Sequence, residues 1–176
     1  MNDKEIKVLA SVGLGAGGVL GLAGTFASSD SLRGLAWGID GTALIIACSL
    51  LTLWFFRMGH EFVATGFLVF AIGESLVVSV SAMDLADGTP SFGAGVGLWA
   101  AGLVLISTPS TFPIIVRLLG FATAILFAWT ACLIFTGAQI TPLSQPFPFF
   151  AYPVLVATFA GWIAVLLRDD IALRHP

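Results

Sequence analysis

The chain has 176 residues, of which 58% are hydrophobic and only 10% are charged, and its mean hydropathy is +1.03. Soluble globular domains carry about 25% charged residues, so this composition excludes an ordinary water-soluble fold. The net charge of −3 comes without a basic cluster, which excludes an electrostatic nucleic-acid surface. Phosphate-loop, nucleophile and metal-ligand motifs are absent, so we expect no enzyme and no catalytic residue.

Six apolar stretches follow one another along the chain, each roughly long enough to cross a bilayer. A hydrocarbon core about 30 Å thick needs about 20 helical residues per crossing. We therefore predict an all-α integral membrane protein, a six-transmembrane-helix bundle forming a single transmembrane domain over residues 1–176. The predicted spans are 6–27, 35–56, 62–82, 92–107, 114–136 and 149–167.

The first stretch has an alternative interpretation as a cleavable signal peptide, because Lys4 and Lys7 precede its apolar run. Cleavage would leave five spans. The run of roughly 20 residues exceeds the usual length of about 7 to 15 for such a signal. The length therefore favours a retained helix.

Basic residues predict the orientation, because Lys and Arg accumulate on the cytoplasmic side of membrane proteins. Six spans place both termini on one side. A cytoplasmic placement leaves only Arg33 outside. We predict a protein integral to the cell (inner) membrane of a bacterium, with both termini cytoplasmic and these basic residues at the inner ends: Lys4, Lys7, Arg57, Arg117, Arg168 and Arg174.

Small residues recur at four-residue intervals in two spans, a pattern that lets helix backbones approach closely in lipid. The first span carries Gly13, Gly17 and Gly21, and the fourth carries Gly93 and Gly97. We predict that these glycines pack against neighbouring helices. The partner helix belongs either to the same protomer or to another chain, in a homo-oligomer or a larger membrane complex.

Short matches between the two halves of the chain raise the hypothesis of two inverted three-helix repeats. Residues 15–20 resemble 93–98, residues 42–45 resemble 123–126, and residues 63–65 resemble 156–158. A three-span unit inserts upside down the second time, as in many transporters. The alternative is chance similarity within a small apolar alphabet.

Two carboxylates fall inside predicted spans, Asp40 in the second and Glu74 in the third. A charged side chain at mid-bilayer costs about 2.5 to 3.5 kcal/mol on insertion scales, so such groups face a bundle interior, a cavity or a partner. The second and third spans form a hairpin about Gly59, which sets the two acids about four residues apart in depth. We predict a substrate or proton site at Glu74 and Asp40, with Ser75 supplying a hydroxyl.

Each acid also has a purely structural interpretation. Glu74 would be protonated and bonded to a serine or a backbone carbonyl, and Asp40 would pair with Arg33 near the surface. The lone His60 gives no basis for a metal or haem site. We therefore expect no metal and no cofactor.

The composition and the buried acids favour a small membrane channel or transporter for a small solute or ion. The alternative is a non-catalytic membrane subunit that packs against a larger complex through its glycine-rich helices. The uncharged stretch 139–153, rich in proline and aromatic residues, is either a loop resting on the interface or a lid over a pore mouth.

Overall fold

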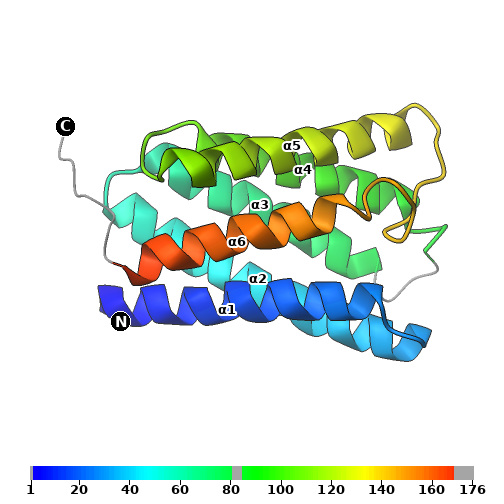
Figure 1. The fold of residues 1–176 in the computed structure, drawn as a ribbon, viewed down its shortest axis with the longest axis horizontal. Coiled ribbons are helices and arrows are strands. Elements are labelled where there is room, and N and C mark those ends of the chain that lie inside the picture. The colour runs from blue at the N-terminus through cyan, green and yellow to red at the C-terminus, as the bar shows by residue number, and fades with distance from the viewer. Residues whose placement is uncertain (1, 81–84, 169–176) are drawn as a thin grey trace.

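The computed structural model describes residues 2–80 and 85–168, and over these ranges it contains six α-helices and no β-strand (Figure 1). The predicted all-helical class is confirmed. The end of the third span at 82, and Arg174, lie outside the described residues. The helices are α1 (Asp3–Thr25), α2 (Asp30–Arg57), α3 (Glu61–Val80), α4 (Thr89–Ser107), α5 (Ile114–Phe135) and α6 (Ala151–Leu167).

Among these described helices, α1 to α5 are long and apolar enough to cross a membrane, and α6 is an apolar helix of 17 residues. Polar caps extend some helices beyond the apolar stretches. Ser29 accepts a hydrogen bond from the backbone of Leu32 at 3.2 Å, so α2 begins at Asp30 rather than at the predicted residue 35. Hydropathy finds the membrane core of a helix but misses its polar first turn.

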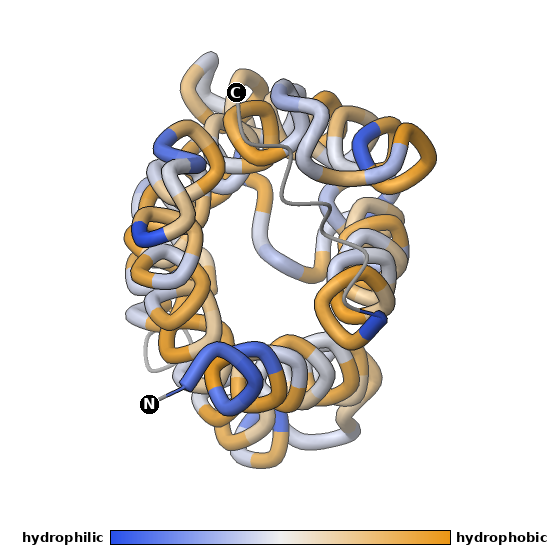
Figure 2. The backbone as a smooth tube through the Cα atoms, turned by 90° about the vertical axis from the view of Figure 1, so that its left-hand side faces the viewer, coloured by the Kyte–Doolittle hydropathy of each residue, from blue (hydrophilic) through white to orange (hydrophobic). Residues whose placement is uncertain are grey.

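The helices form a closed ring in chain order. Each packs against its neighbours in sequence, and α6 returns to pack against α1 (Figure 2). We call the end at which α1 begins and α6 ends the terminal end, and the opposite end the distal end (Figure 1). Gly59, at φ 76°, reverses the chain between α2 and α3 at the terminal end.

Aromatic side chains fill the ring toward its terminal end, and none of them is more than 4% exposed. Phe55 stacks on Phe67 with ring centroids 5.5 Å apart, and Phe67 meets the edge of Trp162 at 5.0 Å. Phe70 stacks on Trp99 at 5.5 Å. We call this set the aromatic layer, and it consists of Phe55, Phe67, Phe70, Trp99, Phe127, Phe159 and Trp162.

The outward faces of the helices are apolar. Large hydrophobic side chains are exposed on all six described helices, among them Val19 on α1, Phe56 on α2, Phe62 on α3 and Ile115 on α5. Such a continuous apolar exterior is unfavourable in water and suits contact with acyl chains. The apolar helices therefore support a location in a membrane.

Glycines bring α3 and α4 closest together. A Cβ on Gly73 would lie 2.7 Å from the carbonyl oxygen of Gly95, and a Cβ on Gly102 would lie 2.7 Å from that of Gly66. These distances are shorter than real Cβ contacts allow. The seven-residue spacing on each helix places both glycine pairs on one antiparallel contact line, which the sequence analysis did not identify.

The glycines predicted to mediate packing lie at contacts inside the protomer. Gly13 and Gly17 face α2, where added Cβ atoms would meet Ala47 at 2.8 Å and Leu44 at 2.4 Å. Gly93 faces Ile134 of α5 at 2.6 Å, whereas Gly97 is less crowded, its nearest neighbour being Ala131 at 3.6 Å. Both predicted stripes thus join helices of the same chain.

Substituting Gly102 with alanine should destabilise the bundle, because the new methyl group would collide with backbone atoms of Gly66 and Phe70. Overpacking of this kind typically costs about 1 to 3 kcal/mol. The matched control is Gly38→Ala, since no atom lies within 4 Å of a Cβ at that position of α2. Thermal unfolding in detergent should show a lower midpoint for Gly102→Ala than for Gly38→Ala, and equal midpoints would contradict the close contact.

Candidate binding site

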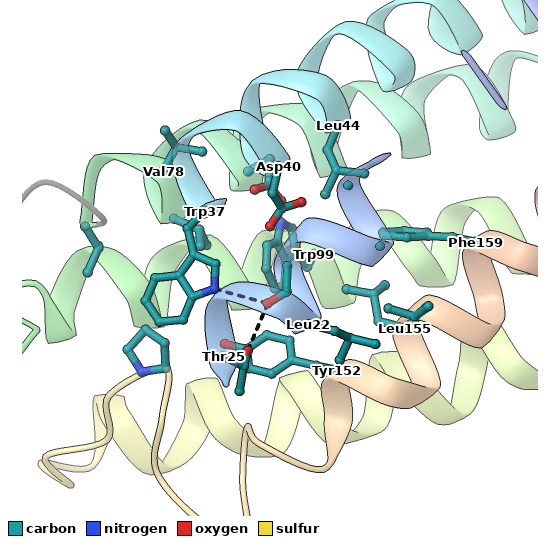
Figure 3. A pocket seen from close by; sticks show the side chains of 18 residues that line it. Leu22, Thr25, Trp37, Asp40, Leu44, Val78, Trp99, Tyr152, Leu155 and Phe159 are labelled. Atoms are coloured by element: carbon teal, nitrogen blue, oxygen red, sulfur yellow. Dashed lines mark hydrogen bonds between the residues drawn. The ribbon is translucent and has the colours of Figure 1, made fainter. Parts of the chain in front are cut away.

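A pocket opens inside the ring between the aromatic layer and the distal end. Five helices and the loop before α6 line it, and Figure 3 shows α2 side chains facing α6 side chains across it. The space available to water-sized molecules is about 60 Å³, enough for several waters. The lining includes Gly17, Gly21, Thr25, Trp37, Asp40, Leu44, Glu74, Val78, Trp99, Pro142, Tyr152, Leu155 and Phe159.

The carboxyl group of Asp40 rests on the glycine stripe of α1. A Cβ on Gly21 would lie 2.8 Å from Oδ2 of Asp40, and a Cβ on Gly17 would lie 3.2 Å from Oδ1. Any larger side chain at these positions would occupy the place of the carboxyl group. The stripe therefore does more than bring α1 and α2 together, because it makes room for the acid.

Glu74 projects from α3 into the same pocket and is only 2% exposed. Its Oε1 lies against Gly41, where a Cβ would come within 2.8 Å, so the acid reaches α2 one residue beyond Asp40. The indole N–H of Trp99 lies beside the carboxyl group. By strict geometry, however, neither that nitrogen nor Oε2 of Glu74 completes a hydrogen bond.

Both acids keep a buried oxygen atom without a hydrogen-bond partner, Oδ1 of Asp40 and Oε2 of Glu74. Within residues 2–80 and 85–168, the residues that line the pocket include no Lys, Arg or His. An unpaired buried polar atom is costly, and native structures usually satisfy such atoms with protein, water or a ligand. The site therefore concentrates acceptor oxygens and lacks the positive charge that would offset them.

The structural alternative for Asp40, pairing with Arg33, does not match the observed contacts, whereas a protonated Glu74 stays an open alternative. Arg33 contacts Asp30 and donates from Nη2 to the carbonyl of Ala27 at 3.1 Å, so it does not pair with Asp40. Ser75 is not brought to the pocket. It lies on the exposed face of α3, one residue round from Glu74, and donates to the carbonyl of Ala71 at 3.0 Å.

Trp37 does not take the position expected of a tryptophan near the end of a span. A tryptophan near the end of a span suggests an anchor at the headgroup boundary. Instead, the ring of Trp37 lines the pocket, and its Nε1 donates to the carbonyl of Gly21 at 3.2 Å, an oxygen that also accepts from Thr25 at 2.9 Å (Figure 3). Trp54, at the other end of α2, also turns inward and is only 4% exposed.

Two further aromatic residues in the pocket were missed from sequence. Trp99 comes from α4 and Tyr152 from the first turn of α6. Trp37 carried a usable signal, because it precedes Asp40 by three residues and so shares its helix face. Nothing in the sequence around Trp99 or Tyr152 predicts a position in the pocket, since that position depends on how helices distant in sequence close the ring.

Comparison with known proteins gives no match to a family model, to a curated protein or to a solved structure. Among the described residues, no group of three or more His, Cys, Asp and Glu side chains is arranged to hold a metal ion. The pocket's chemistry therefore has to be inferred from its own residues.

Cysteine labelling should detect the pocket and show that it is closed toward the terminal end, where the aromatic layer lies. In a variant with Cys48 and Cys132 replaced by alanine, a methanethiosulfonate reagent carrying a trimethylammonium group should modify Leu22→Cys, because Leu22 lines the pocket. It should leave Leu51→Cys unmodified, because Leu51 is fully buried.

Mass spectrometry would follow the modification in both variants. Adding Glu74→Gln to Leu22→Cys should slow the reaction, since removing a negative charge weakens attraction of the cationic reagent. Equal rates at positions 22 and 51 would refute a pocket closed toward the terminal end.

Proposed function

We propose that the protein is a small transporter that exchanges a small cation for a proton, with Glu74 and Asp40 as its internal site. In this proposal all six helices span the bacterial inner membrane and both termini are cytoplasmic. The distribution of Lys and Arg supports that orientation. The pocket then faces the outside of the cell.

The observation that carries the proposal is the pair of carboxylates facing one pocket with unpaired oxygens and no basic side chain in the part of the lining that the structure describes. Buried acids with purely structural roles are normally paired with charges or fully hydrogen-bonded. A transported cation or a proton would supply the missing partner. This favours a site that exchanges its occupant over a permanently satisfied one.

Charge conservation supports exchange with a proton. Two carboxylates in an apolar cavity can share one proton, which leaves a net charge of −1. If a monovalent cation enters as that proton leaves, the net charge stays −1. The electrostatic cost of the buried site is then similar in both states, as a coupled carrier requires.

The aromatic layer supports a transporter rather than an open channel. Phe159 and Trp99 belong to both the pocket lining and the layer, so the pocket ends on packed rings. An open conduit would need water along the whole bundle. A pocket closed at one end instead corresponds to one state of an alternating-access cycle.

The second hypothesis, a non-catalytic subunit that packs against a partner through its glycine-rich helices, has less support. Gly13, Gly17 and Gly93 make their closest contacts within the protomer. Those surfaces are therefore unavailable to another chain without opening the bundle.

Liposomes containing the purified protein and a trapped pH indicator would test the exchange. With an imposed pH gradient, a panel of inorganic and organic monovalent cations is added outside. At least one member should drive proton movement through the wild type, and Glu74→Gln should reduce the rate at least about tenfold because the exchangeable proton is lost.

Glu61→Gln is the matched control, since Glu61 is an exposed acid on the same helix at the terminal end. It should keep the wild-type rate. Equal rates for wild type and Glu74→Gln, with both proteins monodisperse, would end the proposal.

A further inference from the structure

We infer that the pocket selects a small organic cation with a trimethylammonium-type head group. This inference deepens the proposed function and rests on it. Two independent observations point to it. One is the pair of acids, of which Glu74 is 98% buried and still has an unpartnered oxygen, and the other is the aromatic character of the surrounding walls.

The acids specify the charge of the ligand. Oδ1 of Asp40 and Oε2 of Glu74 both lack partners, although the Trp99 indole N–H lies beside the Glu74 carboxyl group, and the described residues of the lining include no cationic side chain. Among the described residues, the Tyr152 hydroxyl and the Cys48 thiol also lie near Glu74, and neither is a cation at neutral pH. A positively charged ligand is therefore favoured, and an anion is excluded.

The walls argue against a small inorganic ion. Ions such as Na⁺ lose a tight hydration shell and need several oxygen ligands in return, like other hard cations. Beyond the acids the lining is mostly Leu, Val, Gly and aromatic residues. Apart from the two carboxyl groups, only Thr25 and Tyr152 among the described lining residues carry a side-chain oxygen, and the Thr25 hydroxyl donates its hydrogen to the carbonyl of Gly21. The pocket is therefore poor in the neutral oxygen ligands that would complete the coordination of such an ion.

The same walls suit a cation whose charge is spread over methyl groups. Trp37 of α2, Trp99 of α4 and Tyr152 of α6 bring three aromatic rings to the pocket (Figure 3). The Arg33 guanidinium lies 6.0 Å from the centroid of the Trp37 ring, and Trp99 stacks on Phe70, so each of these two indoles has at most one face left for a ligand. Aromatic faces attract quaternary ammonium groups, most strongly where water is excluded. An alkylated ammonium also sheds its water more easily than a bare ion does.

The size of the pocket limits the ligand. About 60 Å³ is open to water-sized molecules, less than a trimethylammonium group occupies, so even a compact head group enters only if the side chains around it move apart, and a multi-ring dye is excluded. Val78, Leu44 and Leu155 would contact its methyl groups. We therefore choose choline as the probe, with its neutral carbon isostere 3,3-dimethylbutan-1-ol as the matched ligand.

The test measures binding to the full-length protein in lipid nanodiscs by calorimetry and by tryptophan fluorescence. Choline should bind the wild type at least about tenfold more tightly than the isostere, since the two differ only in charge. Glu74→Gln should weaken choline binding at least about tenfold and leave isostere binding unchanged. Equal affinity for both compounds would overturn the inference, because the pocket would then respond to shape alone.

Aromatic variants test the walls separately. Trp37→Leu should weaken choline binding about tenfold, and Trp37→Phe should restore part of it because a ring face returns. Trp129→Leu is the control, since Trp129 is 58% exposed on the outward face of α5. Unchanged binding in a folded Trp37→Leu protein would overturn the aromatic contribution. The comparison of choline with its isostere on wild-type protein remains decisive if this variant fails to fold.

The liposome assay separates failure of this inference from failure of the proposed function. Proton exchange driven by Na⁺ or K⁺ but not by choline would refute the organic-cation site and leave proton-coupled transport in place. The absence of exchange with every cation, together with absent choline binding, would refute both. Exchange driven by choline and lost in Glu74→Gln would support both.

Discussion

Close backbone approach at glycine is the constraint on which the rest of the structure depends. In lipid, helices gain little from hydrophobic exclusion and associate through van der Waals contact at small residues. Gly66 and Gly73 of α3 meet Gly102 and Gly95 of α4 almost backbone to backbone. This contact fixes the rotation of both helices. Because Gly73 faces α4, the adjacent Glu74 is directed into the ring, beside Trp99 of that neighbouring helix.

Much of the fold was predictable from sequence because the bilayer imposes a single length scale. Apolar stretches located all six described helices, and the differences lie at termini such as that of α2, where a polar cap extends the helix. Both intramembrane acids were also found, since an acid such as Glu74 stands out in an apolar run. Ser75 shows that a residue next to a pocket residue in the sequence need not lie in the pocket. One residue along a helix is about 100° around it, so the neighbour of an inward acid faces out.

The residues that complete the site could not be predicted for a different reason. Trp99 and Tyr152 reach the pocket only because the ring closes between α6 and α1, a contact between the two ends of the chain. The glycine seam between α3 and α4 was also missed, because its members are seven residues apart and do not follow the four-residue pattern typical of packing glycines. Inverted repeats remain a prediction. Gly13 and Gly93 each pack against the following helix and lie 80 residues apart. The sequence match pairs Gly15 with Gly93 instead, at an offset of 78 residues, so the packing positions and the sequence match do not coincide.

If the protein is the transporter proposed above, alternating access would require the aromatic layer to open, and among the described helices the contacts favour α6 as the one whose movement would open it. It supplies Tyr152 to the pocket, Phe159 to its floor and Trp162 to the layer below. Of the six described helices, α6 has the smallest contact with its neighbours, which are α1 and α5. The contact with α5 includes the buried hydrogen bond between Thr123 and Thr158 at 3.1 Å. The acids lie on α2 and α3, which pack on the glycine seams. A shift of α6 would therefore change the side of the membrane from which the carboxylates are accessible. The carboxylates themselves would not move, as exchange around a fixed site requires.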